Sequence, residues 1–554
     1  MIQNTLCFQV YNALKETPDA QLLSFYRSES IRFEALRTAI FNAVSILHAN
    51  HIYPGKRVAV VCPATPEGVI GLLSVILSGA TLVPLPSPEF GRQKQRSIER
   101  LRAITQDAHV DLVLGGPAYQ RYFEQGEEQD SHINYLCISE LMDDTVSFPY
   151  QMPAIGEDDI AVLQYTSGST AHPKGVILTQ SQVLSGCQAI QDSALFSSSD
   201  CYFSWLPLSH DMGLIAFLVG IICQSKMVLS TPAEFVKSPV RWLKAIKSYH
   251  ATVYVGPNFS YQYMLDTVRE KDAFEIDLSS IRVMLNGSEQ VSAELIEQFQ
   301  AYFSPMQLKP NVILPVYGMA EATLAVSFPK LDQSLNQVRS YEGRQIVSVG
   351  FPVSGMSIKV GKYLLTPEQD QLSPVDEIEI SGPSVIRGYW RDGQIDLSST
   401  YQDEYGRIWV KTGDLGFIDG GELYIVGRKK ELLIVNGMNL FPEDVEAQIK
   451  LCDEVYRGRC IATNMLLNGK EQLFLLVEMR QPTMEKCIQL QARMNRIVEQ
   501  LGFVDWVGGV CYANRLLRTP SGKFQRKKMA EEFAQGCFQD ELFFVFGDEL
   551  EVTE

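Results

Sequence analysis

The stretch Ile160-Ala-Val-Leu-Gln-Tyr-Thr-Ser-Gly-Ser-Thr-Ala-His-Pro-Lys-Gly175 says most about the fold and chemistry of this 554-residue chain. Its apolar run, Ala161 to Gln164, predicts a buried strand, and a loop of small and hydroxyl-bearing residues follows. Such residues let the backbone approach a polyphosphate and supply hydrogen-bond donors, while Lys174 adds a positive charge. The chemistry of the loop suits the phosphates of ATP, although composition alone would equally describe an ordinary surface turn, the commoner case. The loop is not a Walker A loop, because Pro173 stands where that motif has its second glycine and Gly175 follows the lysine.

Strand-like runs alternate with helix-compatible stretches on both sides of this loop, from about Arg57 to Val316. The runs are RVAVVC, ATLVPL, VDLVLG, IAVLQY, TVYVG, IRVML and NVILPV. This alternation predicts a layered α/β domain with buried, largely parallel strands. Strand-turn-strand patterns then predict a β-rich subdomain at about residues 345–427. We expect one large N-terminal domain, residues 1–427, built from these α/β subdomains and the β-rich subdomain.

A smaller α+β unit is expected after Gly427, over residues 428–554. LLIVNG reads as a strand, and Pro442 with two following acids predicts a helix start, because proline and acidic residues favour the first turn. RCIATNM and EQLFLLVEM predict two further strands. A basic helix-like run from Arg92 to Arg102, in the first domain, is interpreted as a solvated face.

Composition excludes several classes of protein. The chain has 48 Lys plus Arg against 65 Asp plus Glu, a net charge of −17, which argues against general nucleic-acid binding. Its eleven cysteines show no Cys-x-x-Cys spacing, which argues against a zinc site or a disulfide framework. The longest apolar run, Met212 to Cys223, is too short for a membrane span of about 20 residues. With no secretory signal at the N-terminus, we expect a cytoplasmic protein without a transmembrane segment.

The order T-S-G-S-T-x-x-P-K-G in the phosphate loop resembles the signature of the adenylate-forming (acyl-activating, AMP-binding) superfamily. Further segments similar to this family's motifs follow in the family's order, and the resemblance covers about residues 31–529. It implies an enzyme, a ligase that uses ATP and Mg²⁺ to turn a carboxylate into an acyl-adenylate and pyrophosphate. It also implies that the small C-terminal domain swings during the reaction.

The resemblance gives each segment a role. Tyr317-Gly-Met-Ala-Glu321 is similar to Y-G-x-T-E, whose aromatic ring packs on adenine and whose glutamate, here Glu321, helps to hold magnesium; Ala320 replaces the usual threonine. Asn286-Gly-Ser-Glu289 corresponds to a turn against the adenine. The residues expected to contact ATP are Thr166, Ser167, Gly168, Ser169, Thr170, Lys174, Gly287, Ser288, Tyr317, Gly318, Asp414, Arg428 and Lys523.

The motifs of the second half carry the ribose contacts, the hinge and the adenylation lysine. Val410-Lys-Thr-Gly-Asp-Leu415 resembles the motif whose aspartate, here Asp414, accepts hydrogen bonds from both ribose hydroxyls. Gly427-Arg-Lys-Lys430 resembles the interdomain segment, with Arg428 near the ribose and Lys430 at the hinge. Arg518-Thr-Pro-Ser-Gly-Lys523 resembles the terminal signature, so Lys523 is the expected catalytic lysine.

Four segments resemble the fatty acyl-AMP ligase subfamily in particular. They are H-D-M-G-L at 210–214, N-G-S-E-Q at 286–290, Y-G-M-A-E-A-T-L at 317–324 and G-M-N-L-F-P at 437–442. This resemblance implies a fatty acid substrate, with His210 as a second candidate catalytic residue at the mouth of an acyl pocket and IAFLVGIIC lining it. The alternative for His210 is a hydrogen-bonded structural histidine.

The acyl acceptor has two candidates. The subfamily usually carries an insertion that discourages coenzyme A, and the corresponding stretch here, Ala325 to Val347, is short. The acceptor is therefore either the phosphopantetheine of an acyl carrier protein or coenzyme A. Two other functions stay open: an amino-acid-activating enzyme, with Asp211 meeting the substrate ammonium group, and a nucleotide-binding homologue without turnover. Joint retention of Lys174, Glu321, Asp414 and Lys523 argues against the last.

Overall fold

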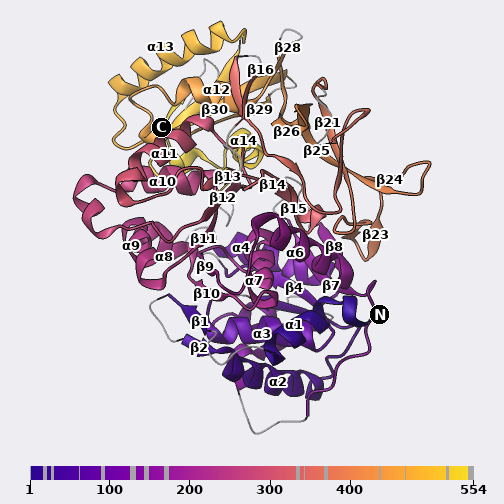
Figure 1. Ribbon diagram of the computed structural model, residues 1–554. Helices are drawn as coiled ribbons and strands as arrows, with labels where there is room; N and C mark the ends of the chain where they lie inside the picture. The colour runs from indigo at the N-terminus through magenta and orange to yellow at the C-terminus, as the bar shows by residue number, and fades with distance from the viewer. Residues whose placement is uncertain are drawn as a thin grey trace. The chain divides into compact units, whose positions relative to one another are not determined.

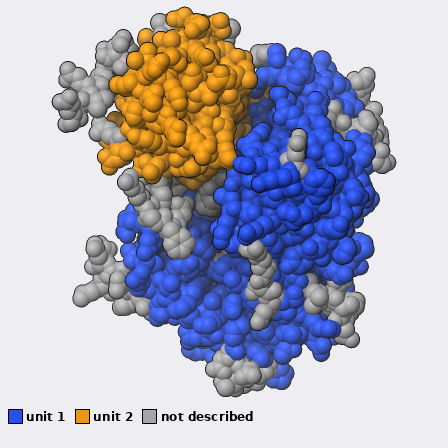
Figure 2. Space-filling model, turned by 90° about the vertical axis from the view of Figure 1, so that its left-hand side faces the viewer, with its two compact units in different colours: residues 1–412, 416–425 blue, residues 413–415, 426–554 orange. Residues whose placement is uncertain are grey.

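The structure is a computed structural model of residues 1–554. It describes residues 2–16, 22–26, 30–61, 63–88, 94–124, 133–142, 149–166, 174–331, 337–341, 343–366, 372–435, 438–467, 470–503, 505–518 and 523–546. The chain forms two compact units (Figures 1 and 2). Unit 1 comprises residues 1–412 and 416–425, and unit 2 comprises residues 413–415 and 426–554.

The first large sheet of unit 1 contains the strands on either side of the phosphate loop. Its eight strands run in the order β23-β22-β8-β7-β4-β3-β5-β6. They are β3 (Arg57–Val61), β4 (Thr81–Leu85), β5 (Leu112–Gly115), β6 (Asn134–Cys137), β7 (Ile160–Tyr165), β8 (Gly175–Thr179), β22 (Tyr389–Arg391) and β23 (Gln394–Asp396). The strands from β7 to β6 pair in parallel, whereas β8 and β22 run antiparallel to their neighbours. The buried runs β3, β4 and β5 explain the continuous apolar sequence there.

The second large sheet of unit 1 has seven strands in the order β13-β12-β11-β9-β10-β1-β2. They are β1 (Leu22–Phe25), β2 (Ser30–Arg32), β9 (Cys201–Ser204), β10 (Lys226–Leu229), β11 (Val253–Pro257), β12 (Val283–Gly287) and β13 (Ile313–Pro315). All neighbours except β1 and β2 pair in parallel. The carboxyl ends of the parallel strands therefore meet at one edge, where α/β proteins place their ligand sites.

Helices connect these strands and supply the rest of the core. Those of unit 1 are α1 (Leu6–Lys15), α2 (Phe33–Ala49), α3 (Pro66–Leu77), α4 (Lys94–Asp107), α5 (Gln120–Glu124), α6 (Gln180–Ala194), α7 (Asp211–Ile222), α8 (Pro232–Lys237), α9 (Pro239–Tyr249), α10 (Asn258–Thr267) and α11 (Ala293–Phe303). Helices α1, α2 and α3 pack together near β1 and β2, as Figure 1 shows. Helix α7 packs against α1 and α6, and most of its apolar side chains are buried.

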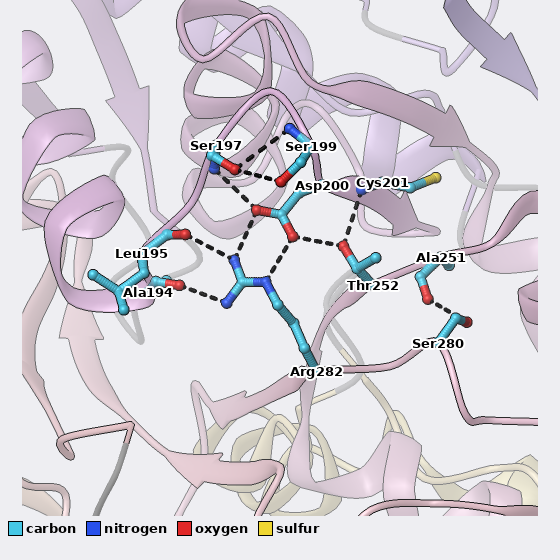
Figure 3. A network of polar contacts seen from close by, with 10 residues as sticks. All are labelled: Ala194, Leu195, Ser197, Ser199, Asp200, Cys201, Ala251, Thr252, Ser280 and Arg282. Atoms are coloured by element: carbon cyan, nitrogen blue, oxygen red, sulfur yellow. Dashed lines mark hydrogen bonds and ion pairs between the residues drawn. The ribbon is translucent and has the colours of Figure 1, made fainter.

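A polar network closes the opposite edge of the second sheet (Figure 3). Arg282, just before β12, binds Asp200, just before β9, at 2.6 Å from Nε to Oδ1 and 2.8 Å from Nη2 to Oδ2. The same guanidinium donates to the carbonyl oxygens of Ala194 and Leu195, at the end of α6. Thr252, before β11, donates to Asp200 at 2.7 Å. The network ties three strand starts and a helix end at the amino edge, away from the strand ends that carry the expected site.

The β-rich region consists of antiparallel strands and lies mostly in unit 1, although its residues 413–415 and 426–428 belong to unit 2. One sheet has the order β20-β19-β21-β25-β24, with β26 pairing with β25. Its strands are β19 (Ser357–Val360), β20 (Tyr363–Leu364), β21 (Asp376–Ser381), β24 (Thr400–Gln402), β25 (Ile408–Asp419) and β26 (Glu422–Arg428), and smaller sheets hold β14 (Tyr317–Met319), β15 (Leu324–Phe328), β18 (Phe351–Pro352), β16 (Val338–Tyr341) and β17 (Arg344–Val347). The hairpin β22–β23, from this part of the sequence, instead joins the first large sheet through β8.

Unit 2 is an α+β unit around one four-stranded sheet, β29-β30-β31-β32. Its elements are β27 (Leu433–Val435), β28 (Met438–Leu440), α12 (Pro442–Ile449), β29 (Cys460–Leu467), β30 (Lys470–Met479), α13 (Met484–Gln500), β31 (Trp506–Tyr512), α14 (Arg526–Ala534) and β32 (Leu542–Phe546). Alternate residues of β30 point to two cores: Leu473 and Leu475 pack with α12 and α13, and Phe474 and Leu476 pack with α14. Among the described residues of both units, no helix is long and apolar enough to cross a membrane.

Candidate functional site

The predicted phosphate loop connects two neighbouring antiparallel strands. Strand β7 ends at Tyr165, β8 begins at Gly175, and these two residues pair across the sheet. Thr166 and Lys174, at the two ends of the loop, are described and partly buried. The predicted contacts Ser167, Gly168, Ser169 and Thr170 lie outside the described residues.

Helix α4 holds the start of the loop through two polar contacts. Nη2 of Arg100 donates to the carbonyl oxygen of Thr166 at 3.3 Å. The hydroxyl of Tyr165 donates to Oδ2 of Asp107, the last residue of α4. The interpretation of the run Arg92 to Arg102 as a solvated face was therefore incomplete, because a helix that covers a sheet can still reach a loop with its long side chains.

Lys174 and Glu321 meet at Tyr389. The ammonium of Lys174 lies 3.2 Å from the centroid of the Tyr389 ring, and the hydroxyl of Tyr389 donates to Oε1 of Glu321 at 2.8 Å. Two predicted site residues, 147 positions apart in sequence (321 minus 174), thus share one partner. Sequence reasoning missed Tyr389, whose only signal was its place beside Trp390 in a short strand.

The pKa of the Glu321 carboxyl depends on burial and on the charged groups near it. Burial raises the pKa of the Glu321 carboxyl, while the Tyr389 hydroxyl and the charge of Lys174 act in the opposite direction. The negative charge of Asp211 also raises this pKa, so the start of α7 lies within electrostatic reach of Glu321. Among the described residues, no three acidic, histidine or cysteine side chains form a metal-binding group. A magnesium ion here would depend on substrate phosphates for further ligands, as this ion usually does.

Tyr317 and Gly318 lie in a tight antiparallel ribbon. Strand β14 pairs with β15, with a register shift between Tyr317 and Gly318. A Cβ on Gly318 would stand 1.8 Å from the carbonyl oxygen of Leu324, which no side chain tolerates. Leu324 itself has a φ of 123°, a strained backbone for a residue with a side chain. The glycine is thus required by the close approach of the two strands.

Gly287 and Ser288 form the turn at the carboxyl end of β12. A Cβ on Gly287 would stand 2.8 Å from the carbonyl oxygen of Val316, and Ser288 has a φ of 71°. The preceding Asn286 is fully buried, and its Nδ2 donates to Oδ1 of Asn258 at 3.1 Å. Its own Oδ1 has no hydrogen-bond partner among the described residues. Tight backbone geometry and a buried amide therefore coincide at the predicted adenine turn.

His210 and Asp211 stand at the start of α7. Nδ1 of His210 lies 2.5 Å from Oδ1 of Asp211. The Met212 N–H donates to the same Nδ1 at 3.4 Å, so the His210 side chain caps the amino end of α7. Oδ1 of Asp211 also accepts the Met212 N–H, at 2.7 Å. Gln164, in β7, donates to the carbonyl oxygen of Ser209 at 2.8 Å and so ties this segment to the strand before the phosphate loop.

Unit 2 contributes the other predicted contacts. Asp414 is 4% exposed, and Nε of Arg428 lies 2.9 Å from its Oδ1. Lys430 is exposed, in a short 3₁₀ turn at Lys429–Glu431. Lys523 is partly buried, one residue before Phe524, which bridges to Arg518. Arg428 and Asp414 thus form an ion pair. The roles predicted for Lys430 and Lys523 stay predictions.

Arg526, three residues after Lys523, was missed by the sequence reasoning. Its guanidinium donates two hydrogen bonds to the Glu446 carboxylate, from Nε to Oε1 at 2.7 Å and from Nη2 to Oε2 at 3.0 Å. Its Nη2 also lies 2.9 Å from Oε1 of Glu443, and its Nη1 lies 3.6 Å from Oε2 of Glu431. Three carboxylates thus surround one cation that connects α14, α12 and the residue next to Lys430. The sequence shows only a basic run, because the acidic partners lie 80 or more positions earlier.

Comparisons of the sequence with known proteins identify its family. The family described as AMP-binding enzyme matches residues 10–390. The chain is 29% identical over 532 residues to the medium-chain-fatty-acid–[acyl-carrier-protein] ligase JamA of Moorena producens (strain JHB), covering 89% of this chain and 88% of the relative. It is 31% identical over 468 residues to the long-chain-fatty-acid–AMP ligase FadD26 of Mycobacterium bovis, covering 77% of each.

Solved structures give the same result for the fold. A chain from studies of fatty acyl-adenylate ligases from E. coli and L. pneumophila is 27% identical, with a TM-score of 0.85 and coverage of 97% of this chain and 98% of that one. A fatty acyl-adenylate ligase from L. pneumophila, in complex with acyl adenylate and pyrophosphate, is 25% identical, with a TM-score of 0.71 and 98% coverage of each. The predicted α/β fold class, with a large N-terminal and a small C-terminal part, is confirmed.

Proposed function

This chain belongs to the AMP-binding enzyme family, and from this premise we propose that it adenylates a fatty acid with ATP and releases pyrophosphate. The observation that carries the proposal is the cluster at the end of the phosphate loop. Lys174 and Glu321, from two separate family motifs, meet there on Tyr389. The relatives named for fatty acid activation cover most of the chain, which supports the fatty acyl substrate class.

The reaction needs charge stabilisation and alignment more than a protein nucleophile. A carboxylate oxygen of the fatty acid attacks the α-phosphorus of ATP in line, the bond to the β-phosphate oxygen breaks, and pyrophosphate leaves. Lys174 and Lys523 are proposed to neutralise the charge that spreads over the phosphoryl oxygens. One such donor contributes about 2.7 to 4 kcal/mol in comparable oxyanion sites. Asp414 is proposed to fix the ribose, and Tyr317 and the turn at Gly287 and Ser288 the adenine.

Glu321 is the residue proposed to hold Mg²⁺. Magnesium in nucleotide sites takes one or two carboxylates together with phosphate oxygens and water, so a single, partly buried carboxyl beside Lys174 suits it. When bound, the ion supplies positive charge to the phosphates. The hydroxyl of Tyr389 orients the carboxyl through its 2.8 Å hydrogen bond.

We propose further that residues 428–554 form a mobile domain that turns at Lys430. Lys523 would act during adenylation and then withdraw, which admits a thiol acceptor. In the second step the acceptor sulfur attacks the acyl carbonyl carbon, the thiol proton leaves, and AMP departs. A few residues at an element end suffice for such a hinge. The three-residue 3₁₀ turn at Lys429–Glu431, between β26 and β27, is short and has no buried side chain, as suits a hinge.

The phosphopantetheine thiol of an acyl carrier protein is the acceptor we favour, since one relative is named as an acyl-carrier-protein ligase. Coenzyme A is the second candidate. The stretch Ala325 to Val347, where the subfamily usually carries its insertion, contains most of β15 and the hairpin β16–β17.

The test is ATP–pyrophosphate exchange with a panel of medium- and long-chain fatty acids, and amino acids as the control substrates. Mass spectrometry of the products, with coenzyme A and separately with a phosphopantetheinylated carrier, identifies the acceptor. Exchange with amino acids alone would replace the fatty acid proposal. Exchange with neither class would leave a nucleotide-binding protein without turnover.

A further inference from the structure

Strand β22 lies between helix α4 and the phosphate-loop lysine. Tyr389 and Trp390 are consecutive residues of β22, so their side chains point to opposite faces of the sheet. Tyr389 contacts Lys174 and Glu321, and Trp390 contacts the end of α4. A strand from the β-rich region thus supplies one residue to the site and one to a support behind it.

The support behind β22 is built around Asp107. Nε1 of Trp390 donates to the carbonyl oxygen of Asp107 at 2.6 Å, and the N–H of Asp392 donates to Oδ1 of Asp107 at 2.7 Å. The other carboxylate oxygen accepts the Tyr165 hydroxyl. Arg57 stacks on the Trp390 ring at 3.8 Å from its centroid. One carboxylate therefore fixes both the start of the phosphate loop and the strand that carries Tyr389.

Gly175 completes this frame at the end of the loop. A Cβ there would stand 3.1 Å from the Tyr165 ring and 3.4 Å from Cβ of Trp390. The backbone after Lys174 is thus packed between the two aromatic side chains. The packing of Gly175 fixes the backbone next to Lys174, so only the long side chain of the lysine remains to be positioned.

We propose that Tyr389 is a positioning residue for adenylation, whose ring holds the Lys174 ammonium at the phosphate site and whose hydroxyl holds Glu321 beside it. The inference rests on the proposed function, since it gives Lys174 a nucleotide phosphate as its ligand. A lysine stem is flexible, and a ring face attracts the ammonium without neutralising its charge. The ring contact thus leaves the lysine charged, and the lysine loses less conformational freedom when ATP binds.

Two substitutions separate the ring from the hydroxyl. Tyr389→Phe keeps the ring under Lys174 and loses the bond to Glu321, whereas Tyr389→Leu loses both. By titration calorimetry with ATP and no fatty acid, we expect Tyr389→Phe to change Kd by about twofold at most and Tyr389→Leu to weaken binding roughly fivefold or more. In exchange kinetics, Tyr389→Leu should raise KM for ATP, and Tyr389→Phe should lower kcat at nearly unchanged KM.

A double-mutant cycle tests whether the ring acts through the lysine. If it does, Lys174→Met and Lys174→Met/Tyr389→Leu should bind ATP equally weakly. Matched controls come from Tyr401, whose hydroxyl donates to Glu379 and accepts from Lys359 at 2.9 Å in the β-rich region. Tyr401→Phe and Tyr401→Leu should leave Kd for ATP unchanged.

Three results would overturn the proposal: wild-type affinity in Tyr389→Leu, tighter ATP binding in that variant, or losses that add in the double variant. If Tyr389→Leu does not unfold cooperatively, Tyr389→Met gives the same test with a side chain that fills more of the space. Because the binding assay contains no fatty acid, the expected Kd pattern without any fatty acid exchange would refute the proposed function and leave this inference standing.

Discussion

Arg526→Met is expected to destabilise unit 2. The Arg526 side chain is 19% exposed and its main partner Glu446 is 3% exposed, so the substitution removes the cation that binds this buried carboxylate at 2.7 Å and leaves only the longer contact to Lys450, at 3.8 Å, among the ion pairs described for it. Breaking such a pair costs about 3 to 5 kcal/mol. Glu446 keeps the Ala462 N–H at 3.0 Å, which places the loss toward the lower end. Arg526→Lys keeps the charge but not the two-pronged contact, and should cost about 1.5 to 3 kcal/mol.

Hydrogen exchange measured by mass spectrometry reports this loss for each unit separately. Peptides from α12 and α14 should exchange faster in Arg526→Met, while those from β7 and β8 in unit 1 should not change. Arg493→Met is the matched control, since Arg493 also faces two carboxylates, at 3.2 and 3.9 Å, but is 45% exposed. Arg493→Met should lower the free energy of unfolding by about 0 to 1 kcal/mol. Equal exchange in the two variants would refute the argument that burial makes the Arg526 cluster strong.

The remaining predictions concern chemistry, backbone geometry and pH. Lys523→Ala should slow acyl-adenylate formation roughly 10²- to 10³-fold in single-turnover kinetics, with an unchanged melting temperature. Gly318→Ala should weaken ATP binding in calorimetry, because its Cβ would stand 1.8 Å from the Leu324 carbonyl oxygen and the ribbon would have to shift; wild-type affinity would contradict this. Burial opposes ionisation of Asp200, but hydrogen bonds from Arg282 and other donors hold its pKa below the ordinary value. Its stabilisation is therefore full above about pH 4 and falls as the pH decreases further. In urea unfolding, Asp200→Asn should be less stable than wild type at pH 7 and converge with it toward pH 3.

The sequence predicted the elements whose signal is local. Buried parallel strands such as β3 and β4 have continuous apolar runs, because both of their faces are covered. The start of α12 followed from Pro442 and two acids in the first turn. The phosphate-loop prediction rests on an equally local signal, since small residues, hydroxyl groups and a lysine fall within one stretch, but it stays a prediction because residues 167–173 lie outside the described residues.

The residues that were missed depend on contacts between distant segments. Tyr389 has no special neighbour in sequence, and its meaning comes from β22 pairing with β8, a segment more than 200 positions earlier. Arg526 looked like part of a basic run, whereas the fold surrounds it with carboxylates. The basic run Arg92 to Arg102 was interpreted as a solvated face, and the exposed Arg100 within it reaches Thr166 only because α4 packs on the sheet. Periodicity gives the face of a helix but not what that face meets.

Charged side chains expected to bind ATP have partners within their own unit. In unit 1 the ammonium of Lys174 lies over the Tyr389 ring, and its charge also acts on the carboxyl groups of Glu321 and Asp396. In unit 2 the guanidinium of Arg428 lies 2.9 Å from Asp414, the carboxylate expected to accept the ribose hydroxyls. Ribose binding would therefore exchange or share an existing ion pair. Since exchange returns only the difference between two interactions, the contact of Asp414 with the ribose should contribute less to the affinity for ATP than its hydrogen bonds alone suggest.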